Sequence, residues 1–174
     1  MKIYLIGMPG CGKSTFGKKA AEQLNMDFID LDTEIINYRQ KSINDIFEQE
    51  GEHSFREIES KLLKSITADK DHFIMATGGG APCFFDNMEF MNNHGITFYI
   101  DTSIALLLER LSLKGINKRP LLKKMGAENL EPGLKDKLNE RLPFYTKAKF
   151  ILPYQEELEK EIVLHIKSRI KSQN

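Results

Sequence analysis

Short runs of consecutive hydrophobic residues alternate along this chain with longer segments in which hydrophobic residues recur at helical spacing. The runs predict buried strands at residues 3–6, 28–30, 73–76, 96–100 and 150–152. Helices are predicted between and after them, at residues 15–24, 54–66, 103–113, 131–147 and from about 155 onward. Strands that alternate with helices form a parallel sheet covered on both faces. The pattern therefore predicts a three-layer α/β fold whose ligands bind at the carboxyl ends of the strands.

Two of the predicted helices carry further signals. In the segment 54–66 the hydrophobic positions Phe55, Ile58, Leu62 and Ile66 fall on one helical face. In the segment 131–147, Pro143 lacks the amide hydrogen that a helix interior needs. We therefore expect the helix over 131–147 to kink or end near Pro143.

Composition narrows the function without naming it. The chain has 174 residues, which suits a single domain over 1–174, and 25 basic residues balance 25 acidic ones. With no net charge, no global field attracts nucleic acid or an anionic membrane. No apolar run approaches the length of a membrane span, and two cysteines imply no disulfide framework. We expect a cytoplasmic protein that binds neither nucleic acid nor membrane.

The strongest chemical signal is the segment Gly7–Ser14, which matches the phosphate-loop pattern G-x-x-x-x-G-K-[ST]. Its glycines let backbone N–H groups turn around a phosphate, and the following helix points its N-terminus at the same anion. A glycine-rich turn without function is the alternative, but the motif lies between a strand and a helix, as phosphate binding requires. The motif predicts a site for a purine nucleoside triphosphate with Mg²⁺, formed by Gly10, Cys11, Gly12, Lys13, Ser14 and Thr15.

Within this loop, each side chain has an expected task. Lys13 would reach the β- and γ-phosphates, and the hydroxyl of Ser14 would bind Mg²⁺. Cys11 lies beside a helix N-terminus, which can lower the pKa of a thiol, but a small side chain that simply fits the loop is the favoured interpretation.

Motifs elsewhere argue against a GTPase switch. The segment 117–120 reads Asn-Lys-Arg-Pro, with proline where a guanine-binding motif has aspartate, and the sequence contains no D-x-x-G. A small kinase remains, and it must also bind an acceptor.

Asp30 and Asp32 are the first candidates for that acceptor side. If both belong to the end of the second strand, their carboxylates share one face at the ligand edge. One could order Mg²⁺ and its waters, and the other could accept a hydrogen bond from the acceptor hydroxyl. The alternative is that Asp32 only caps the next helix.

Arg56 and the glycine triplet Gly78–Gly80 are the next candidates. Arg56 could make a two-pronged contact with an acceptor carboxylate, and Glu59, one helical turn along, could hold it in place. The triplet follows the third strand and lets backbone approach a ligand closely. A solvated arginine and a tight turn are the respective alternatives.

The segment 111–127 contains basic residues and no acidic residue, although the chain as a whole is neutral. It predicts a mobile lid at about 112–126 that closes over phosphates, with Arg119 meeting the charge on the transferred group. Arg141 adds a cation after this lid. A solvated basic loop is the alternative.

In combination, these motifs resemble the shikimate kinase family. The residues that carry the likeness are GMPGCGKST at 7–15, DLD at 30–32, FREIE at 55–59, TGGGA at 77–81, RPLL at 119–122 and ERLPFY at 140–145. The resemblance implies a five-stranded sheet in the order 2-3-1-4-5, a monomer, and ATP- and Mg²⁺-dependent phosphorylation of the shikimate 3-hydroxyl (EC 2.7.1.71). This reaction belongs to chorismate and aromatic amino acid biosynthesis.

The resemblance also implies roles for individual residues. Asp32 would contact the shikimate hydroxyls near the metal ion. The metal ion would be bound by Ser14, Asp30 and Asp32. Shikimate would bind to Arg56 and Arg141 through its carboxylate, to Gly78, Gly79 and Gly80 along its ring, and to an aromatic wall of Phe47 and Phe55. Lys13, Asp32 and Arg119 would be catalytic, and Arg110 would pack on adenine. Another small-molecule kinase, such as a gluconate kinase, and a non-catalytic nucleotide-binding protein remain the rivals.

Overall fold

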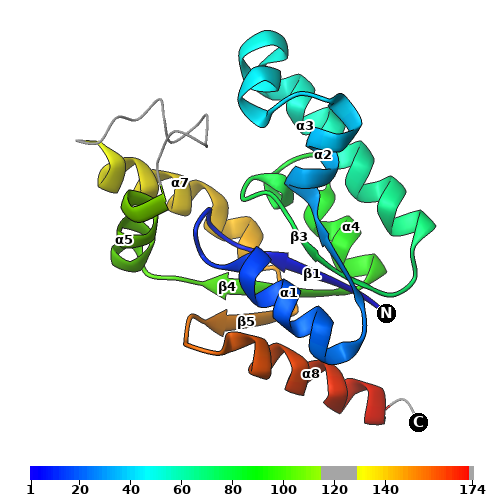
Figure 1. The fold of residues 1–174 in the computed structure, drawn as a ribbon. Helices are drawn as coiled ribbons and strands as arrows, with labels where there is room; N and C mark the ends of the chain where they lie inside the picture. Colours follow the sequence, from blue (N-terminus) through cyan, green and yellow to red (C-terminus); the bar gives the residue numbers. More distant parts are fainter. Residues whose placement is uncertain (115–128, 173–174) are drawn as a thin grey trace.

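A computed structural model describes residues 1–114 and 129–172, with side chains described for 1–111 and 129–169. Its centre is a parallel sheet of five strands in the order β2-β3-β1-β4-β5 (Figure 1). The strands are β1 (Lys2–Ile6), β2 (Asp27–Asp30), β3 (Phe73–Ala76), β4 (Ile96–Asp101) and β5 (Phe150–Pro153). The predicted strands and their order are confirmed.

Helices cover both faces of this sheet. They are α1 (Lys13–Leu24), α2 (Leu31–Arg39), α3 (Ile43–Asp69), α4 (Asn87–His94), α5 (Ile104–Lys114), α7 (Leu130–Tyr145) and α8 (Leu158–Ser172), with a short 3₁₀ helix η1 (Ala81–Cys83). The connection from β1 passes β3 and leads to β2 at one edge of the sheet. The connection from β3 passes β1 and leads to β4, in the opposite direction along the sheet. Because crossovers between parallel strands are right-handed, this reversal places α1 and α4 on opposite faces (Figure 1).

The reversal of direction at β1 determines where a ligand can bind. The crossovers diverge on either side of β1 and leave a crevice at its carboxyl end. In β1, Ile3, Leu5 and Ile6 are fully buried, and Leu5 lies in register with Ala76 of β3 and Phe98 of β4. The phosphate loop therefore extends from a buried strand in the middle of the sheet.

Two short helices were not predicted, and one of them changes the position of Asp32. The second strand ends at Asp30, whose side chain caps α2 by accepting a hydrogen bond from the backbone N–H of Asp32. Asp32 lies in the first turn of α2, so the expectation that it shares a strand face with Asp30 is wrong. The other missed helix, α4, buries Met88 and Met91 in an otherwise polar sequence.

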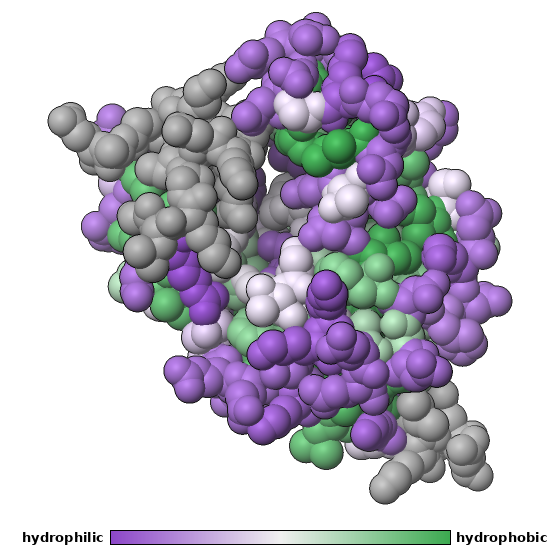
Figure 2. All heavy atoms as spheres, in the orientation of Figure 1, coloured by the Kyte–Doolittle hydropathy of each residue, from purple (hydrophilic) through white to green (hydrophobic). Residues whose placement is uncertain are grey.

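The helix predicted over 54–66 is longer than expected. It runs from Ile43 to Asp69 and is interrupted at Gly51, whose backbone has φ 81° and ψ 171°. With α2 it forms a lobe that projects beyond the sheet (Figure 1). The space-filling view shows mostly hydrophilic side chains on this face, with hydrophobic groups gathered beneath the tip of the lobe (Figure 2).

Three other expectations concern the helix over 131–147, membrane spans and the lid. The helix over 131–147 ends at Tyr145, two residues after Pro143. Among the described residues, no helix is both long and apolar enough to cross a membrane. Most of the expected lid, including Arg119, lies outside the described residues.

The start of α3 generates a stability prediction. Ser42 accepts a hydrogen bond from the Asp45 backbone N–H at 3.1 Å, and the Asp45 side chain accepts one from the Ser42 backbone N–H. Ser42→Ala should lower the free energy of unfolding by about 1 kcal/mol, measured by urea denaturation, because an N-terminal N–H loses its acceptor. The control Ser65→Ala, at an exposed position inside α3, should change it by less than about 0.5 kcal/mol. Equal effects of the two substitutions would contradict the capping role.

Candidate active site

The phosphate loop joins β1 to α1 and encloses the side chain of Lys13. Gly12, the residue before α1, has φ 103°, a left-handed conformation that favours glycine. The Lys13 ammonium donates to the backbone carbonyls of Gly7 at 2.8 Å and Met8 at 3.0 Å, and only 8% of the residue is exposed. The loop thus presents a largely desolvated cation beside a helix N-terminus, which together suit an anion.

Oxygen groups lie next to this loop. The Ser14 hydroxyl donates to the Asp30 carboxylate at 2.6 Å, and Asp30 is held at the start of α2 by the cap that it forms. Hydroxyl and carboxylate oxygens are hard donors that suit Mg²⁺, which keeps several waters and binds phosphates as well. Among the described residues, no group of three His, Cys, Asp or Glu side chains could hold a metal ion. The donors present fit a metal held jointly by protein and nucleotide.

Arg56 is the centre of a second cluster, on α3. Its guanidinium is 4% exposed and donates to Glu59, which is fully buried, at 2.7 Å. Its central carbon lies 5.0 Å from the ring centre of Phe55 and 4.7 Å from that of Phe84. The ring centre of Phe47 lies 4.6 Å from that of Phe55, with the rings tilted by 39°, and Phe47 completes the aromatic enclosure. The predicted aromatic wall therefore surrounds the guanidinium that would bind the acceptor.

The glycine triplet packs directly against charged side chains. A methyl group on Gly78 would overlap the Glu59 carboxylate, and one on Gly80 would overlap the Arg56 guanidinium. On Gly79 it would approach Arg141 Nη1 to 3.0 Å. The triplet is glycine because this close approach leaves no room for a side chain. This close packing brings together three of the predicted substrate-binding segments, namely the triplet itself, Arg56 and Arg141.

Asp32 lies where the two clusters meet. Its Oδ1 would be 3.2 Å from a methyl group on Gly78, close to Glu59, while its backbone is bonded to the Asp30 carboxylate that accepts from Ser14. The residue is exposed, unlike Glu59. Asp32 is therefore accessible to a ligand placed between the phosphate loop and Arg56.

The electrostatics of the second cluster are dominated by burial. Burial raises the pKa of Glu59 to about 7, with Arg56 and Arg141 acting in the opposite direction and Asp32 adding to the rise. Within the described part of the chain, Glu59 Oε1 and Arg56 Nε are buried without a hydrogen-bond partner. Buried polar groups are costly to leave unpaired, so unpaired donors and acceptors beside a substrate cluster indicate a site shaped for a ligand.

Two residues connect the phosphate loop to the glycine triplet. Arg141 Nη1 lies 3.8 Å from the Met8 sulfur, and the Tyr145 hydroxyl donates to the Gly79 carbonyl and also contacts Met8 at 3.8 Å. Sequence reasoning predicted Arg141 but missed Tyr145. The helical spacing of the two residues, one turn apart on α7, was the available signal. Donor and acceptor sides thus share a packed boundary.

Arg110 lies on the other side of the phosphate loop. It donates to the Gly10 carbonyl at 3.3 Å and packs over the ring of Tyr154, with its central carbon 4.3 Å from the ring centre. Tyr154 follows β5, where sequence signals were weak. The predicted position of Arg110 beside a nucleotide base is compatible with this geometry.

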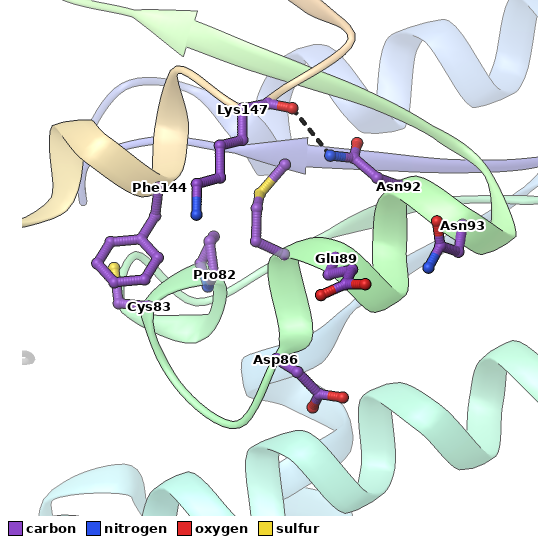
Figure 3. Close-up of a pocket in the computed structure, with 9 residues that line it drawn as sticks. Pro82, Cys83, Asp86, Glu89, Asn92, Asn93, Phe144 and Lys147 are labelled. Carbon is purple, nitrogen blue, oxygen red and sulfur yellow. Dashed lines mark hydrogen bonds between the residues drawn. The ribbon is translucent and has the colours of Figure 1, made fainter.

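A separate cavity of about 430 Å³ lies behind η1, between α4 and the end of α7. Figure 3 shows Phe144 and Cys83 close together on one side of it, with Pro82 and Lys147 next to them and Glu89 and Asn92 on α4 toward the other side. None of the predicted site residues lines it. Burial raises the pKa of the Cys83 thiol to about 11, which disfavours the reactive thiolate. This cavity is therefore separate from the candidate site formed by the phosphate loop and the Arg56 cluster.

Comparisons with known proteins agree with this geometry. The family model described as shikimate kinase matches residues 9–171. A shikimate kinase of Parabacteroides distasonis is 44% identical over 84% of each chain, and one of Azobacteroides pseudotrichonymphae is 41% identical over 97% of this chain and 99% of its own. Two solved structures superpose with a TM-score of 0.86. The shikimate kinase of Bacteroides thetaiotaomicron is 34% identical over 98% of each chain. That of Acinetobacter baumannii, in complex with shikimate, is 35% identical over 99% of this chain and 94% of its own.

The raised pKa of Glu59 predicts how stability depends on pH. Between pH 4.5 and about 7 the folded state retains a proton on Glu59 that the unfolded state has lost. The contribution of Glu59 to the free energy of unfolding therefore falls as pH rises through this window. Glu59→Gln should remove this fall, seen as a wild-type-minus-variant difference that declines between about pH 5 and pH 7 in urea denaturation.

Glu22→Gln is the control, because that side chain is exposed on α1. Its difference from wild type should stay nearly constant over the window. A constant difference for Glu59→Gln as well would show that burial does not raise the pKa of Glu59.

Proposed function

The chain belongs to the shikimate kinase family, and we propose that it transfers the γ-phosphoryl group of ATP to the 3-hydroxyl of shikimate at the site described above. The observation that carries this assignment is the buried Arg56–Glu59 cluster, which the glycine triplet connects to the phosphate loop. A cation enclosed by aromatic rings suits a small carboxylated acceptor. The phosphate loop supplies the donor side.

On the donor side, Gly10–Thr15 would hold the phosphates through backbone N–H groups, and Lys13 would turn from its carbonyl partners toward the β- and γ-phosphates. Arg110 would pack on the adenine, next to Tyr154. Arg119, which lies outside the described residues, remains the candidate for stabilising charge on the transferred group.

Ser14 and Asp30 would hold Mg²⁺, with Asp32 nearby. When bound there, the ion would neutralise part of the charge on the phosphates. The close Ser14–Asp30 contact supports this assignment, because it presents hard oxygen donors at the N-terminus of α1.

On the acceptor side, Arg56 and Arg141 would bind the carboxylate of shikimate, and the backbone of Gly78–Gly80 would line its ring. Phe47 and Phe55 would exclude water from Arg56, which strengthens its attraction for a carboxylate. Asp32 would accept the proton, or the hydrogen bond, of the 3-hydroxyl. Since phosphoryl transfer requires little covalent chemistry from the protein, this positioning supplies most of the catalysis. The monomeric state and the cytoplasmic location stay predictions.

An acceptor panel tests the function. ADP release should occur with shikimate, and should stay at the ATP-only background with gluconate or AMP, in a coupled assay with Mg²⁺. Release with gluconate rather than shikimate would move the chain to another class of small-molecule kinase. No release with any acceptor would favour a nucleotide-binding protein without catalysis.

Asp32→Asn tests the role of the carboxylate at the boundary. We expect kcat to fall by about 10²–10⁴ with ATP affinity changed by less than about threefold, because the group acts on the acceptor hydroxyl in the transition state. Asp27→Asn, a 62% exposed position at the start of β2, serves as a control and should leave both constants nearly unchanged. Near-normal turnover by Asp32→Asn would remove Asp32 from catalysis.

A further inference from the structure

Arg56 is paired with two glutamates that differ sharply in exposure. Glu59 is fully buried and lies 2.7 Å from Nη1, whereas the Glu52 side chain is 45% exposed and lies 3.2 Å from Nη2. Both partners belong to α3, one turn before and one turn after Arg56. Only the contact with the exposed Glu52 can be exchanged for water or for a ligand at low cost.

The hydrogen-bond inventory of the guanidinium shows why this exchange matters. A carboxylate can bridge a guanidinium either across Nη1 and Nη2 or across Nε and Nη2. Glu59 engages Nη1, and Arg56 Nε is buried without a partner among the described residues. Nη2 belongs to both edges. Nη2 carries one N–H group toward each edge, and Glu52 accepts from one of the two. Glu52 therefore places a negative charge beside the donor atom that both edges share, where it repels the carboxylate of a ligand.

Glu59 cannot take part in such an exchange. Its carboxylate is enclosed between Arg56 and Gly78, and moving it would leave two buried polar groups unpaired. Glu52, by contrast, directly follows the interruption of α3 at Gly51, and its carboxylate is accessible to solvent. The contact with Glu59 is therefore fixed, whereas the contact with Glu52 can be exchanged.

We propose that Glu52 is an internal competitor of the acceptor: its carboxylate occupies Arg56 Nη2 until the carboxylate of the acceptor displaces it, which lowers the affinity for the acceptor. This inference rests on the proposed binding of the shikimate carboxylate by Arg56. Glu52 is an affinity-determining residue, and it contacts neither the transferred phosphate nor the reacting hydroxyl.

Glu52→Gln tests the competition. The variant keeps the length of the side chain but loses the charge, so the KM for shikimate should fall by about two- to fivefold, the size expected for an exposed ion pair. The Kd for shikimate, measured by calorimetry without nucleotide, should fall by the same factor. The change should appear in these constants rather than in kcat or in the KM for ATP. An unchanged or increased KM for shikimate would overturn the proposal.

Two further arms make the test specific. Glu57→Gln removes an equal charge from the same helix at a 60% exposed position, and it should leave the KM for shikimate unchanged. With the carboxamide of shikimate as acceptor, Glu52→Gln should give no decrease in KM, because no carboxylate competes. The same decrease with both acceptors would overturn the proposal, since the effect would not pass through the carboxylate.

Failure of this inference can be distinguished from failure of the proposed function. Arg56→Ala should raise the KM for shikimate at least about tenfold if Arg56 binds the carboxylate. If Arg56→Ala has this effect and Glu52→Gln does not lower the KM, only the competition is wrong. If Arg56→Ala leaves the KM unchanged, the carboxylate contact on which the competition rests is wrong. If the wild type does not phosphorylate shikimate, the proposed function itself fails.

Discussion

The buried ion pair of Arg56 and Glu59 is the interaction on which the acceptor side of this protein depends. Taking both charges out of water is costly, and the raised pKa of Glu59 reflects that cost. A buried pair of this kind contributes little net stability, which supports the proposal that it prepares Arg56 for an acceptor carboxylate. Three aromatic rings and the glycine triplet pack closely around the pair.

Sheet topology connects this cluster to the chemistry of phosphate. Strands β1 and β3 are parallel neighbours in the sheet. The phosphate loop after β1 and the glycine triplet after β3 therefore emerge side by side. Arg141 and Tyr145, one turn apart on α7, contact Met8 of the loop, and Tyr145 also bonds Gly79. A displacement of the phosphate loop would therefore shift the acceptor side, and a displacement of the acceptor side would shift the loop. These contacts tie the phosphate loop to the glycine triplet, which supports the proposal that the two substrates bind on either side of this boundary.

Much of this arrangement was predictable from sequence, and the failures have physical reasons. The strands were visible because buried parallel strands are continuous apolar runs, and the phosphate loop because its glycines follow one. Helices α2 and α4 were missed because each buries only two or three side chains in a polar segment. Asp32 was assigned to a strand because the cap formed by Asp30 depends on side-chain geometry. The contact of Glu52 with Arg56 was missed because the predicted helix began at residue 54, after Glu52. The contact of Tyr145 was missed because helical spacing places it beside Arg141 but does not show that it bonds Gly79.

Gly80→Ala tests most directly whether close packing of the triplet on Arg56 forms the acceptor site. Gly80 has φ −94°, which alanine adopts without strain, so the added methyl group acts only through its overlap with the guanidinium. The measurement is the pair of dissociation constants for shikimate and for a non-hydrolysable ATP analogue, by calorimetry, on variant protein with a native melting transition. We expect the constant for shikimate to rise at least about tenfold and that for the nucleotide to change less than about twofold. An unchanged affinity for shikimate would contradict the account.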